Sequence, residues 1–361
     1  GIKGVGRTHI EAVRALPEEA ELVAVCDIDE EAVKACAERY EVPKAVTDFE
    51  ELLEMEEVQA VSICTPHFLH RDMTVAALEA GKHVLCEKPM AVTVKQAEEM
   101  VEVARRAGRV LGISFQHRFR PEVGVMRRLV EEMSPLLWFV WIDCSLRTQA
   151  YYDSGDWRGT WWGEGGGVLI NQAVHDLDLL QWVFGMPKEV LGSAANLLHD
   201  IEVEDTASAI FEYEGGARGT FVAGNVSYPS VYRVQAGLDG GVILFDGKIR
   251  VGRAKERISE FIKKSPEMWG VPEVEWEEPE IPEVERKGHV AAVWDFLTAI
   301  KEGREPLCPG EEGVKSTELV NAIILSTVKG GPVSLPLDRE EIEQTYEDLK
   351  EGKLRLPRFW A

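Results

Sequence analysis

The chain lacks the patterns that mark several classes of protein. Its six cysteines, Cys26, Cys36, Cys64, Cys86, Cys144 and Cys308, form no CxxC pair. We therefore expect reduced packing cysteines of a cytoplasmic protein, not a disulfide framework or a metal site. No window approaches the roughly 20 apolar residues that a membrane-spanning helix needs. The chain also has no low-complexity tract and no internal repeat.

Basic residues are scarce as well. The chain has 40 lysines and arginines against 63 acidic residues, which gives a formal net charge of -23. This balance disfavours binding to a nucleic-acid backbone or to an anionic membrane surface, because both are negatively charged. Small molecules are the expected partners.

The first third of the chain alternates helix-like and strand-like segments. The apolar runs 60–64 (AVSIC) and 110–114 (VLGIS) are continuous, as in parallel strands covered on both faces. We predict a doubly wound parallel sheet, a Rossmann domain over residues 1–120, with ligands at the carboxyl ends of its strands. The chain starts on a glycine turn without the strand that should precede it. We expect that strand to precede Gly1. The sequence leaves open whether a signal peptide precedes it as well.

After Pro121 the pattern changes to antiparallel-looking segments with turn signals at 214–216 (EGG) and 239–241 (DGG). We predict a second, α+β domain over residues 121–361, built on a large, open, mostly antiparallel sheet with helices on one face. The acidic stretch 272–285 is expected to form a surface loop or edge. Two late helices, 289–303 and 312–331, end on glycines. One arrangement consistent with the sequence has these helices packed against the Rossmann domain.

The N-terminal turn has features of a nucleotide site. Gly1, Gly4 and Gly6 open a helix, and Asp27 ends a strand-like run 21 residues after Gly6. Glycines let a backbone approach a pyrophosphate, and an acid at this distance accepts hydrogen bonds from the adenosine ribose. Lys3 stands where GxGxxG has its middle glycine, so the turn alone is a weak fingerprint.

The residues after Asp27 favour one form of the cofactor. Neither Ile28 nor Asp29 is basic, so a 2′-phosphate would find no partner, and NAD is favoured over NADP. The alternative interpretation is that Asp27 only caps the following helix.

Two further strand ends should meet at the same crevice, 64–70 (CTPHFLH) and 85–92 (LCEKPMAV). In the second, Glu87 and Lys88 directly follow an apolar run, and a buried charge is costly unless the strand end opens into a site. Beside a nicotinamide, Lys88 would exchange the proton of a hydroxyl while hydride moves. Burial and the positive nicotinamide would both lower the pKa of Lys88 toward the range of a general base. The alternative is a surface Glu-Lys pair at a turn.

A third segment, 165–185, begins with three glycines and contains Asn171 and His175 four residues apart. This spacing places both side chains on one face of a single helix. The loop 151–162 (YYDSGDWRGTWW) precedes it, which favours a site wall over a packing histidine.

These motifs together make the chain similar to the glucose-fructose oxidoreductase, inositol dehydrogenase and rhizopine catabolism family, Gfo/Idh/MocA. The resemblance covers essentially the whole chain: the glycine turn with His9, CTPHFLH, EKP at 87–89, FQHRFRP at 115–121, and the GGG to HDLD segment. It implies a pyridine-nucleotide dehydrogenase, with Lys88 as catalytic lysine, Pro89 as a cis proline and His175 as a second acid/base group.

One departure concerns Asn171, because many inositol dehydrogenase-like members carry Asp there. An amide is no proton acceptor, so Asn171 would orient the substrate by hydrogen bonding. The expected cofactor-binding residues are Gly1, Lys3, Gly4, Val5, Gly6, Asp27, Thr65, Pro66, His67, His70, Glu87, Lys88 and Gln116. The expected substrate-binding residues are Arg118, Tyr152, Trp157, Arg158, Trp161, Asn171 and His175. For Arg118 an interdomain salt bridge is equally consistent with the sequence.

We therefore expect an NAD-dependent dehydrogenase that oxidises a secondary hydroxyl of a sugar, inositol or related polyol, or reduces the matching ketone. The segment NQAVH, with YYDSGDWRG before it, resembles the family members that act on hexoses or nucleotide-linked sugars. The alternatives are an NAD-assisted glycoside hydrolase without net redox change and a non-catalytic NAD-dependent sugar sensor. The resemblance also implies a homodimer or homotetramer formed through the open sheet face, to which the alternating apolar residues of 208–224 would contribute.

Overall fold

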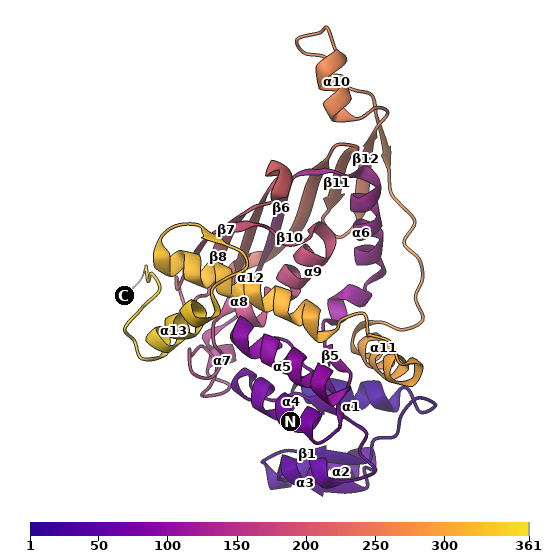
Figure 1. Cartoon of the computed structure of the whole chain (residues 1–361), viewed down its shortest axis with the longest axis vertical. Helices are drawn as coiled ribbons and strands as arrows, with labels where there is room; N and C mark the ends of the chain where they lie inside the picture. Colours follow the sequence, from indigo (N-terminus) through magenta and orange to yellow (C-terminus); the bar gives the residue numbers. More distant parts are fainter. Residues whose placement is uncertain (360–361) are drawn as a thin grey trace. The chain divides into compact units, whose positions relative to one another are not determined.

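A computed structural model describes residues 1–359 of the chain (Figure 1). The chain separates into two compact units. The first contains Gly1–Arg120 and Val284–Thr317, and the second contains Pro121–Glu283 and Glu318–Ala361.

The first unit is built from parallel strands alternating with helices, as predicted. Its strands are β1 (Ala24–Cys26), β2 (Lys44–Val46), β3 (Ala60–Ile63), β4 (His83–Cys86) and β5 (Leu111–Ile113). Its helices are α1 (Val5–Arg14), α2 (Glu30–Tyr40), α3 (Phe49–Glu54), η1 (His67–Leu69), α4 (His70–Glu79), α5 (Val94–Ala107), η2 (Gln116–Phe119), α11 (Gly288–Glu302) and the start of α12 (Gly310–Lys329). Every strand pair of this unit runs parallel.

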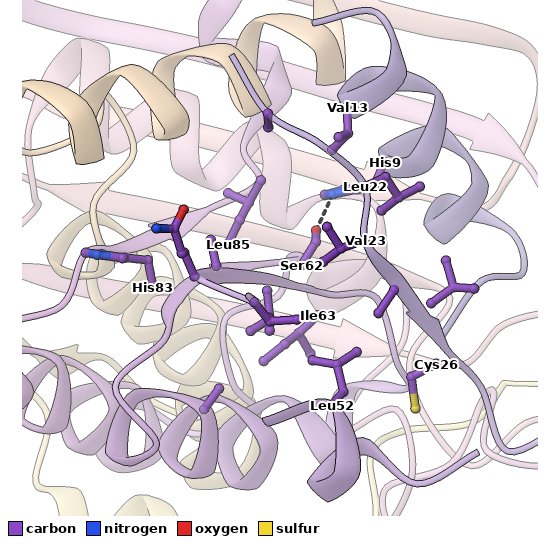
Figure 2. Close-up of a pocket in the computed structure, with 18 of the residues that line it drawn as sticks. His9, Val13, Leu22, Val23, Cys26, Leu52, Ser62, Ile63, His83 and Leu85 are labelled. Atoms are coloured by element: carbon purple, nitrogen blue, oxygen red, sulfur yellow. Dashed lines mark hydrogen bonds between the residues drawn. The ribbon is translucent and has the colours of Figure 1, made fainter. Parts of the chain in front are cut away.

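The strands of the first unit form two sheets, β1-β2 and β3-β4-β5. A cavity of about 500 Å³ has β1 and β3 in its walls, together with apolar side chains such as Leu22, Leu52, Ile63 and Leu85 (Figure 2). Most of the residues that line this cavity are apolar, so it belongs to the core of the first unit.

Strand β4 is the centre of the first unit's core, since Val84, Leu85 and Cys86 are all at most 3% exposed. Leu85 belongs to a cluster with Val293 and Phe296 of α11, a helix far away in sequence. Burying one such side chain contributes about 1.5–3 kcal/mol. This packing holds the end of β4, where Glu87 and Lys88 follow.

The second unit contains one nine-stranded sheet with the order β13-β12-β11-β10-β6-β9-β8-β7-β14. The strands are β6 (Leu136–Leu146), β7 (Glu189–Ala195), β8 (Thr206–Glu212), β9 (Arg218–Gly224), β10 (Val226–Leu238), β11 (Gly241–Phe245), β12 (Ile249–Ala254), β13 (Val274–Glu277) and β14 (Val333–Ser334). The helices are α6 (Pro121–Met133), α7 (Gln149–Tyr152), α8 (Val168–Asn171), α9 (Val174–Phe184), η3 (Glu214–Gly216), α10 (Ile258–Lys264), the rest of α12, and α13 (Arg339–Lys350). Only β6 and β9 pair in parallel, so the prediction of a mostly antiparallel sheet is confirmed.

One face of this sheet is covered and the other is open. Helices α6 and α9 lie along the covered face (Figure 1), where Phe139 and Trp141 are buried. On the other face Trp138 is 44% and Ile210 is 47% exposed. The apolar alternation of 208–224 marks the covered face, because Phe211 and Phe221 are fully buried. The prediction that the alternating apolar residues of this segment supply the open face is therefore wrong for all of them except Ile210.

Two further predictions concern the acidic stretch and membrane association. All four residues of β13 are exposed at the edge of the sheet, as predicted for the acidic stretch. Among residues 1–359, no helix combines the length and the apolar character that crossing a bilayer requires.

Candidate functional site

Each glycine of the N-terminal turn has a steric reason. A Cβ on Gly1 would lie 2.4 Å from the carbonyl oxygen of Cys64, and one on Gly6 would lie 2.2 Å from that of Gly1. Gly4 has a φ of 54°, in the left-handed region that glycine adopts most readily. It precedes α1, whose N-terminus has no side-chain cap. The turn thus offers uncapped N–H groups and a close backbone approach, which suits a pyrophosphate.

Asp27 lies directly after β1, beside this turn. Its Oδ2 accepts from the backbone N–H of Ile2 at 3.0 Å, and its Oδ1 accepts from that of Asp29 at 3.1 Å. The cap of α2 is Asp29, which accepts from Ala32, so the alternative that Asp27 is the helix cap is wrong. Each carboxylate oxygen has a second lone pair for a ribose hydroxyl.

The neighbours of Asp27 fit NAD. Ile28 is 94% exposed and offers no charge to a 2′-phosphate. The amine of Lys3 is paired with Asp29 at 2.7 Å. With the turn of Gly1, Gly4 and Gly6, these residues would hold the adenosine and pyrophosphate parts of NAD.

The second strand end, after β3, is held together by a histidine. His70 is fully buried, with Nδ1 at 2.7 Å from the carbonyl oxygen of Pro89 and Nε2 at 2.9 Å from that of Thr65. His70 therefore connects the second and third strand ends and has no surface for a cofactor, contrary to its prediction as a cofactor ligand. His67 is also buried, in η1, whereas Pro66 is half-buried.

The third strand end, after β4, carries three side chains that we call the strand-end cluster: His9, Glu87 and His289. Oε1 of Glu87 lies 2.7 Å from Nε2 of His9 and 3.6 Å from Nε2 of His289. Nδ1 of His9 is 2.5 Å from the hydroxyl of Ser62 (Figure 2). Sequence reasoning missed His289, which comes from α11, about 200 residues after Glu87.

The charges of this cluster are set by its contacts. Burial opposes ionisation of Glu87, but the nearby His289 ring and the hydrogen-bonded His9 hold the pKa of Glu87 well below its usual range. Burial also opposes charge on His9, yet Cys64 and Glu87 raise the pKa of His9 to about 10. His9 and Glu87 are therefore an imidazolium-carboxylate pair at neutral pH. Although the three side chains have ligand atoms within 4.8 Å of one another, this internal cation disfavours a metal ion there.

Lys88 follows the cluster directly. Its backbone N–H donates to Oε2 of Glu87 at 3.2 Å, and the Lys88-Pro89 bond is cis, as the resemblance implies. Its side chain is half-buried, and so is Gln116 of η2. The negative charge of Glu87 lies one residue from Lys88, which ties the position of Lys88 to the buried pair.

Arg118 does not have the environment of a substrate ligand. Its side chain is completely enclosed, and Nη2 donates to Oε2 of Glu312 at 2.8 Å within the first unit. It is an internal ion-pair residue, so its prediction as a substrate ligand is wrong.

Asn171 and His175 lie in the second unit, each 9% exposed. They belong to two helices and not to the predicted single one: α8 ends at Asn171, and α9 begins at Val174. The break contains an i to i−5 bond from the N–H of Ala173 to the carbonyl of Val168 at 2.8 Å. Such a π-type turn interrupts α-helical bonding and is frequent at functional sites.

Asn171 is part of a second group, which we call the tyrosine cluster: Tyr151, Arg158, Glu164, Asn171 and Gln172. The hydroxyl of Tyr151 receives N–H groups from Arg158 at 2.8 Å, Asn171 at 2.9 Å and Gln172 at 3.2 Å. Asn171 also donates to the carboxylate of Glu164. Arg158 lies over the ring of Tyr151, 4.6 Å from its centroid.

Two predicted substrate residues have internal roles instead. Tyr152 is 4% exposed, and its hydroxyl accepts from Asn225 at 2.9 Å. Trp161 is also 4% exposed and packs edge-on against Tyr346 at 5.9 Å. The prediction of substrate contact is therefore wrong for both.

Trp157 and Arg158 are only half-buried. The guanidinium of Arg158 lies 4.5 Å from the centroid of Trp157, so the two side chains form one surface with Tyr151. Trp157 and Arg158 therefore keep their prediction as substrate ligands.

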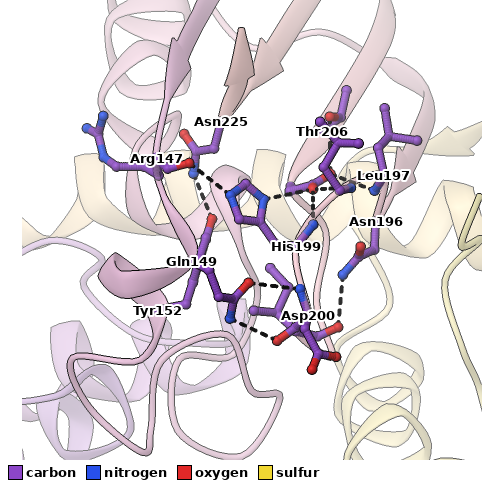
Figure 3. A network of polar contacts seen from close by, with 12 residues as sticks. Arg147, Gln149, Tyr152, Asn196, Leu197, His199, Asp200, Thr206 and Asn225 are labelled. Carbon is purple, nitrogen blue, oxygen red and sulfur yellow. Dashed lines mark hydrogen bonds and ion pairs between the residues drawn. The ribbon is translucent and has the colours of Figure 1, made fainter. Parts of the chain in front are cut away.

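The segment that carries the tyrosines is held by His199 (Figure 3). Its Nδ1 is 2.9 Å from Asp205, and its Nε2 is 2.9 Å from the carbonyl oxygen of Arg147. Asp205 raises the pKa of His199 through their hydrogen bond, against the effect of burial. A doubly protonated ring satisfies both acceptors, and it packs against Tyr152 at 4.8 Å. This arrangement fixes α7 and therefore Tyr151.

Both units of the chain are similar to known proteins. Residues 1–115 match a family described as an oxidoreductase family with an NAD-binding Rossmann fold, and residues 139–243 match the GFO/IDH/MocA C-terminal domain. The chain is 32% identical to trans-1,2-dihydrobenzene-1,2-diol dehydrogenase of Mus musculus, over 56% of this chain and 60% of the relative. It is 31% identical to D-glucoside 3-dehydrogenase of Escherichia coli, over 63% of this chain and 61% of the relative. The chain thus spans about six tenths of these curated relatives.

Among solved structures, the chain is similar to the WlbA dehydrogenase from Chromobacterium violaceum in complex with NADH and UDP-GlcNAcA. The TM-score is 0.82 at 30% identity, over 94% of this chain and 95% of that one. WlbA from Bordetella pertussis, with the same two ligands, gives 0.77 at 26% identity, over 94% and 98%. The chain therefore belongs to the GFO/IDH/MocA family of NAD-binding oxidoreductases.

Proposed function

We propose that this protein is an NAD-dependent dehydrogenase that oxidises a secondary hydroxyl of a sugar ring, or reduces the matching ketone. The observation that carries the proposal is the convergence of the glycine turn, Asp27 and Lys88 at the strand ends of a Rossmann unit. Family membership supports it, since relatives are named as dehydrogenases of glucosides and of inositol. Bound NAD would supply the hydride acceptor.

Within this proposal Lys88 takes the proton of the reacting hydroxyl, with His175 as the second acid/base group. The buried Glu87 carboxylate holds the backbone of Lys88 and provides a nearby negative charge. Asn171 cannot accept a proton, and its N–H groups are directed to Tyr151 and Glu164. Toward a substrate Asn171 would therefore act through Oδ1, as an acceptor from a hydroxyl.

A nucleotide-linked sugar or a glucoside is the substrate class that we favour. This follows from the similarity over almost the full chain to WlbA, solved with UDP-GlcNAcA, and from the glucoside dehydrogenase relative. The decisive measurement is absorbance at 340 nm with NAD and a panel of UDP-GlcNAcA, methyl glucosides, inositols and free hexoses. Growth of NADH with one compound would establish the activity. Release of free sugar from a glycoside without net formation of NADH would contradict the dehydrogenase proposal and favour NAD-assisted hydrolysis.

Replacing Lys88 with Met tests the acid/base role. We expect kcat to fall about 10²-fold or more, the size of a general acid/base contribution, with NAD affinity retained. Lys34→Met, on the exposed face of α2, is the matched control and should keep full activity. A fully active Lys88→Met variant would remove Lys88 from the chemistry. Turnover of no sugar by a wild-type protein that binds NAD tightly would favour a sensor.

We also propose that the protein is cytoplasmic and forms homodimers or homotetramers through the open face of its large sheet. Exposed apolar residues on this sheet support the assembly: Trp138, Leu191, Ile210 and Val231 are 44%, 43%, 47% and 44% exposed. Light scattering at micromolar concentration is the test, and a monomer would contradict the proposal.

A further inference from the structure

The hydroxyl of Tyr151 has an unusual set of partners. Three N–H groups are directed at this one oxygen, from a guanidinium and two amides. A phenol oxygen accepts hydrogen bonds and also carries one proton to donate. A phenol oxygen that keeps its proton has two lone pairs. The two shorter bonds, from Arg158 and Asn171, fill them, and the N–H of Gln172 at 3.2 Å shares one of them.

The direction of these bonds follows from the other ends of the same side chains. The guanidinium of Arg158 can only donate. Asn171 must present its NH₂ group to this region, because the same nitrogen donates to the Glu164 carboxylate, an acceptor only. The Oε1 of Gln172 accepts from Asn225 at 3.0 Å, which directs its NH₂ group to Tyr151.

We propose that the O–H of Tyr151 donates a hydrogen bond to an oxygen of the bound sugar, which makes Tyr151 a substrate-binding and specificity-determining residue. This inference rests on the proposed function, because Asn171 is placed at the substrate there. Tyr151 is half-buried, in contrast to Tyr152, and its hydroxyl is 2.9 Å from the Asn171 amide. We infer that this proton is directed to a group outside the tyrosine cluster, and a substrate oxygen at Asn171 is such a group.

The surroundings hold the donor in place. The guanidinium groups of Arg158 and Arg147 both contact the ring of Tyr151, at 4.6 and 5.7 Å from its centroid. Burial raises the pKa of Tyr151, against the effect of Arg158, and Glu164 adds to the rise. Tyr151 therefore keeps its proton at neutral pH. A fixed, protonated donor costs little reorganisation when the substrate binds.

Tyr151 and Asn171 together define a chemical pattern. Tyr151 would offer its O–H as donor and Asn171 its Oδ1 as acceptor, and the Nδ2 of the same Asn171 amide lies 2.9 Å from the Tyr151 hydroxyl. A sugar hydroxyl matches this pair, because it accepts one hydrogen bond and donates another. A ketone or ether oxygen satisfies Tyr151 alone. We infer that the site selects a substrate with a free hydroxyl at this position.

The test is calorimetric binding of UDP-GlcNAcA, with methyl α-D-glucoside as a second probe, to the NADH-loaded protein. Tyr151→Phe keeps the ring that Arg147 and Arg158 contact and removes only the hydroxyl. We expect the Kd of the probe to rise about tenfold, as for the loss of one hydrogen bond. Tyr152→Phe is the matched control, because its hydroxyl faces the interior, and it should stay within about twofold. NADH affinity should be the same in all three proteins.

If Tyr151 only positioned Asn171, Tyr151→Phe would also weaken probe binding. A second variant therefore separates this structural role from direct donation to the sugar. Substituting 3-fluorotyrosine for Tyr151 keeps all three incoming bonds but makes the phenol more acidic. We expect probe affinity to be lost at a lower pH than in the wild type, whereas a structural role leaves this profile unchanged. Arg147, Arg158 and Glu164 are the charged groups that face the hydroxyl and are the same in both proteins.

The outcomes are distinct. A Tyr151→Phe variant with wild-type affinity would overturn the inference, because the hydroxyl would then contribute no hydrogen bond to the bound sugar. An unshifted pH profile of the fluorotyrosine variant, or a wild type that binds neither probe, would also overturn it. Weakened binding in Tyr151→Phe without turnover in the wild type would leave Tyr151 as the donor and reject the dehydrogenase proposal.

Discussion

The strand-end cluster and the tyrosine cluster both combine a cation with polar side chains, but they differ in charge and in burial. The first pairs an imidazolium with a carboxylate, His9 with Glu87, and both side chains are 4% exposed. The second directs three donors to a neutral phenol, Tyr151, and keeps its cation, Arg158, half-buried. The first is complete within the protein, whereas the second has one donor left for a ligand.

The two clusters also differ in the secondary structure that positions their side chains. Glu87 follows a buried strand of a parallel sheet, where the carboxyl ends of neighbouring strands meet. Tyr151 lies on a four-residue helix between a long strand and a loop, so no regular element dictates its neighbours. We expect the first cluster to matter most for stability and the second for substrate binding.

The largest effect on stability should come from Glu87→Gln. Removing the carboxylate leaves the His9 imidazolium buried without its partner, which costs about 3–5 kcal/mol of unfolding free energy. Urea denaturation measures this loss. Glu57→Gln, in an exposed pair with Lys44, should leave the urea midpoint unchanged. Equal midpoints for both variants would show that the buried pair does not differ from a surface pair.

A smaller, pH-dependent effect should follow from His199→Gln. Because Asp205 raises the folded pKa of His199, its contribution is full below the unfolded pKa of about 6.5 and is lost as pH rises through the folded value. At pH 6 we expect a loss of about 2 kcal/mol, the range for a hydrogen bond to a charged group. At pH 10 the variant and the wild type should converge. A difference that is constant with pH would show that His199 is not charged in the fold.

The smallest effect should come from Glu204→Gln, beside the tyrosine cluster. Glu204 accepts from the N–H groups of Gly167 and Leu169 at 2.9 and 3.1 Å. Burial raises its pKa to about 7, and the charge of Glu164 adds to the rise. A raised carboxyl pKa stabilises the protonated fold, so the stability from Glu204 is full below about 4.5 and is lost as pH rises through about 7.

Thermal unfolding between pH 5 and pH 8.5 tests this prediction. The melting temperature of Glu204→Gln should fall less with rising pH than that of the wild type. Parallel curves would show that Glu204 does not titrate in this range, and that the tyrosine cluster tolerates a buried carboxylate as well as the strand-end cluster does.

Much of the first unit's site was predictable because it depends on periodicity. Continuous apolar runs predicted β3 and β5, and the alternation of strands and helices predicted that Asp27, Thr65 and Glu87 each follow a strand end. The assignment of His70 to the cofactor was wrong, because a histidine near a strand end has the same sequence pattern whether it faces a ligand or two carbonyl groups. His289 was not predictable, since nothing in α11 marks its contact with Glu87.

The second unit was less predictable at the level of side chains. The segment 165–185 has the spacing of one helix, yet a π-type turn divides it between Asn171 and Val174. Adjacent tyrosines project to different sides of a short helix, and no pattern in the sequence says which side is internal. The contacts of Tyr152 with Asn225 and His199 settle this, because both partners come from loops distant in the chain.

The sequence by itself determined the alternation of strands and helices, the change to an antiparallel sheet after Pro121, and the residues at the strand ends, because backbone periodicity and glycine sterics act locally. The tertiary structure alone decided which charges are paired and which hydroxyl retains a donor. Those properties depend on contacts such as Glu87 with His289 and Tyr151 with Arg158. The spacing of these residues along the chain does not determine such contacts. A buried polar group must find its partner in the fold, and only the fold shows which residue that partner is.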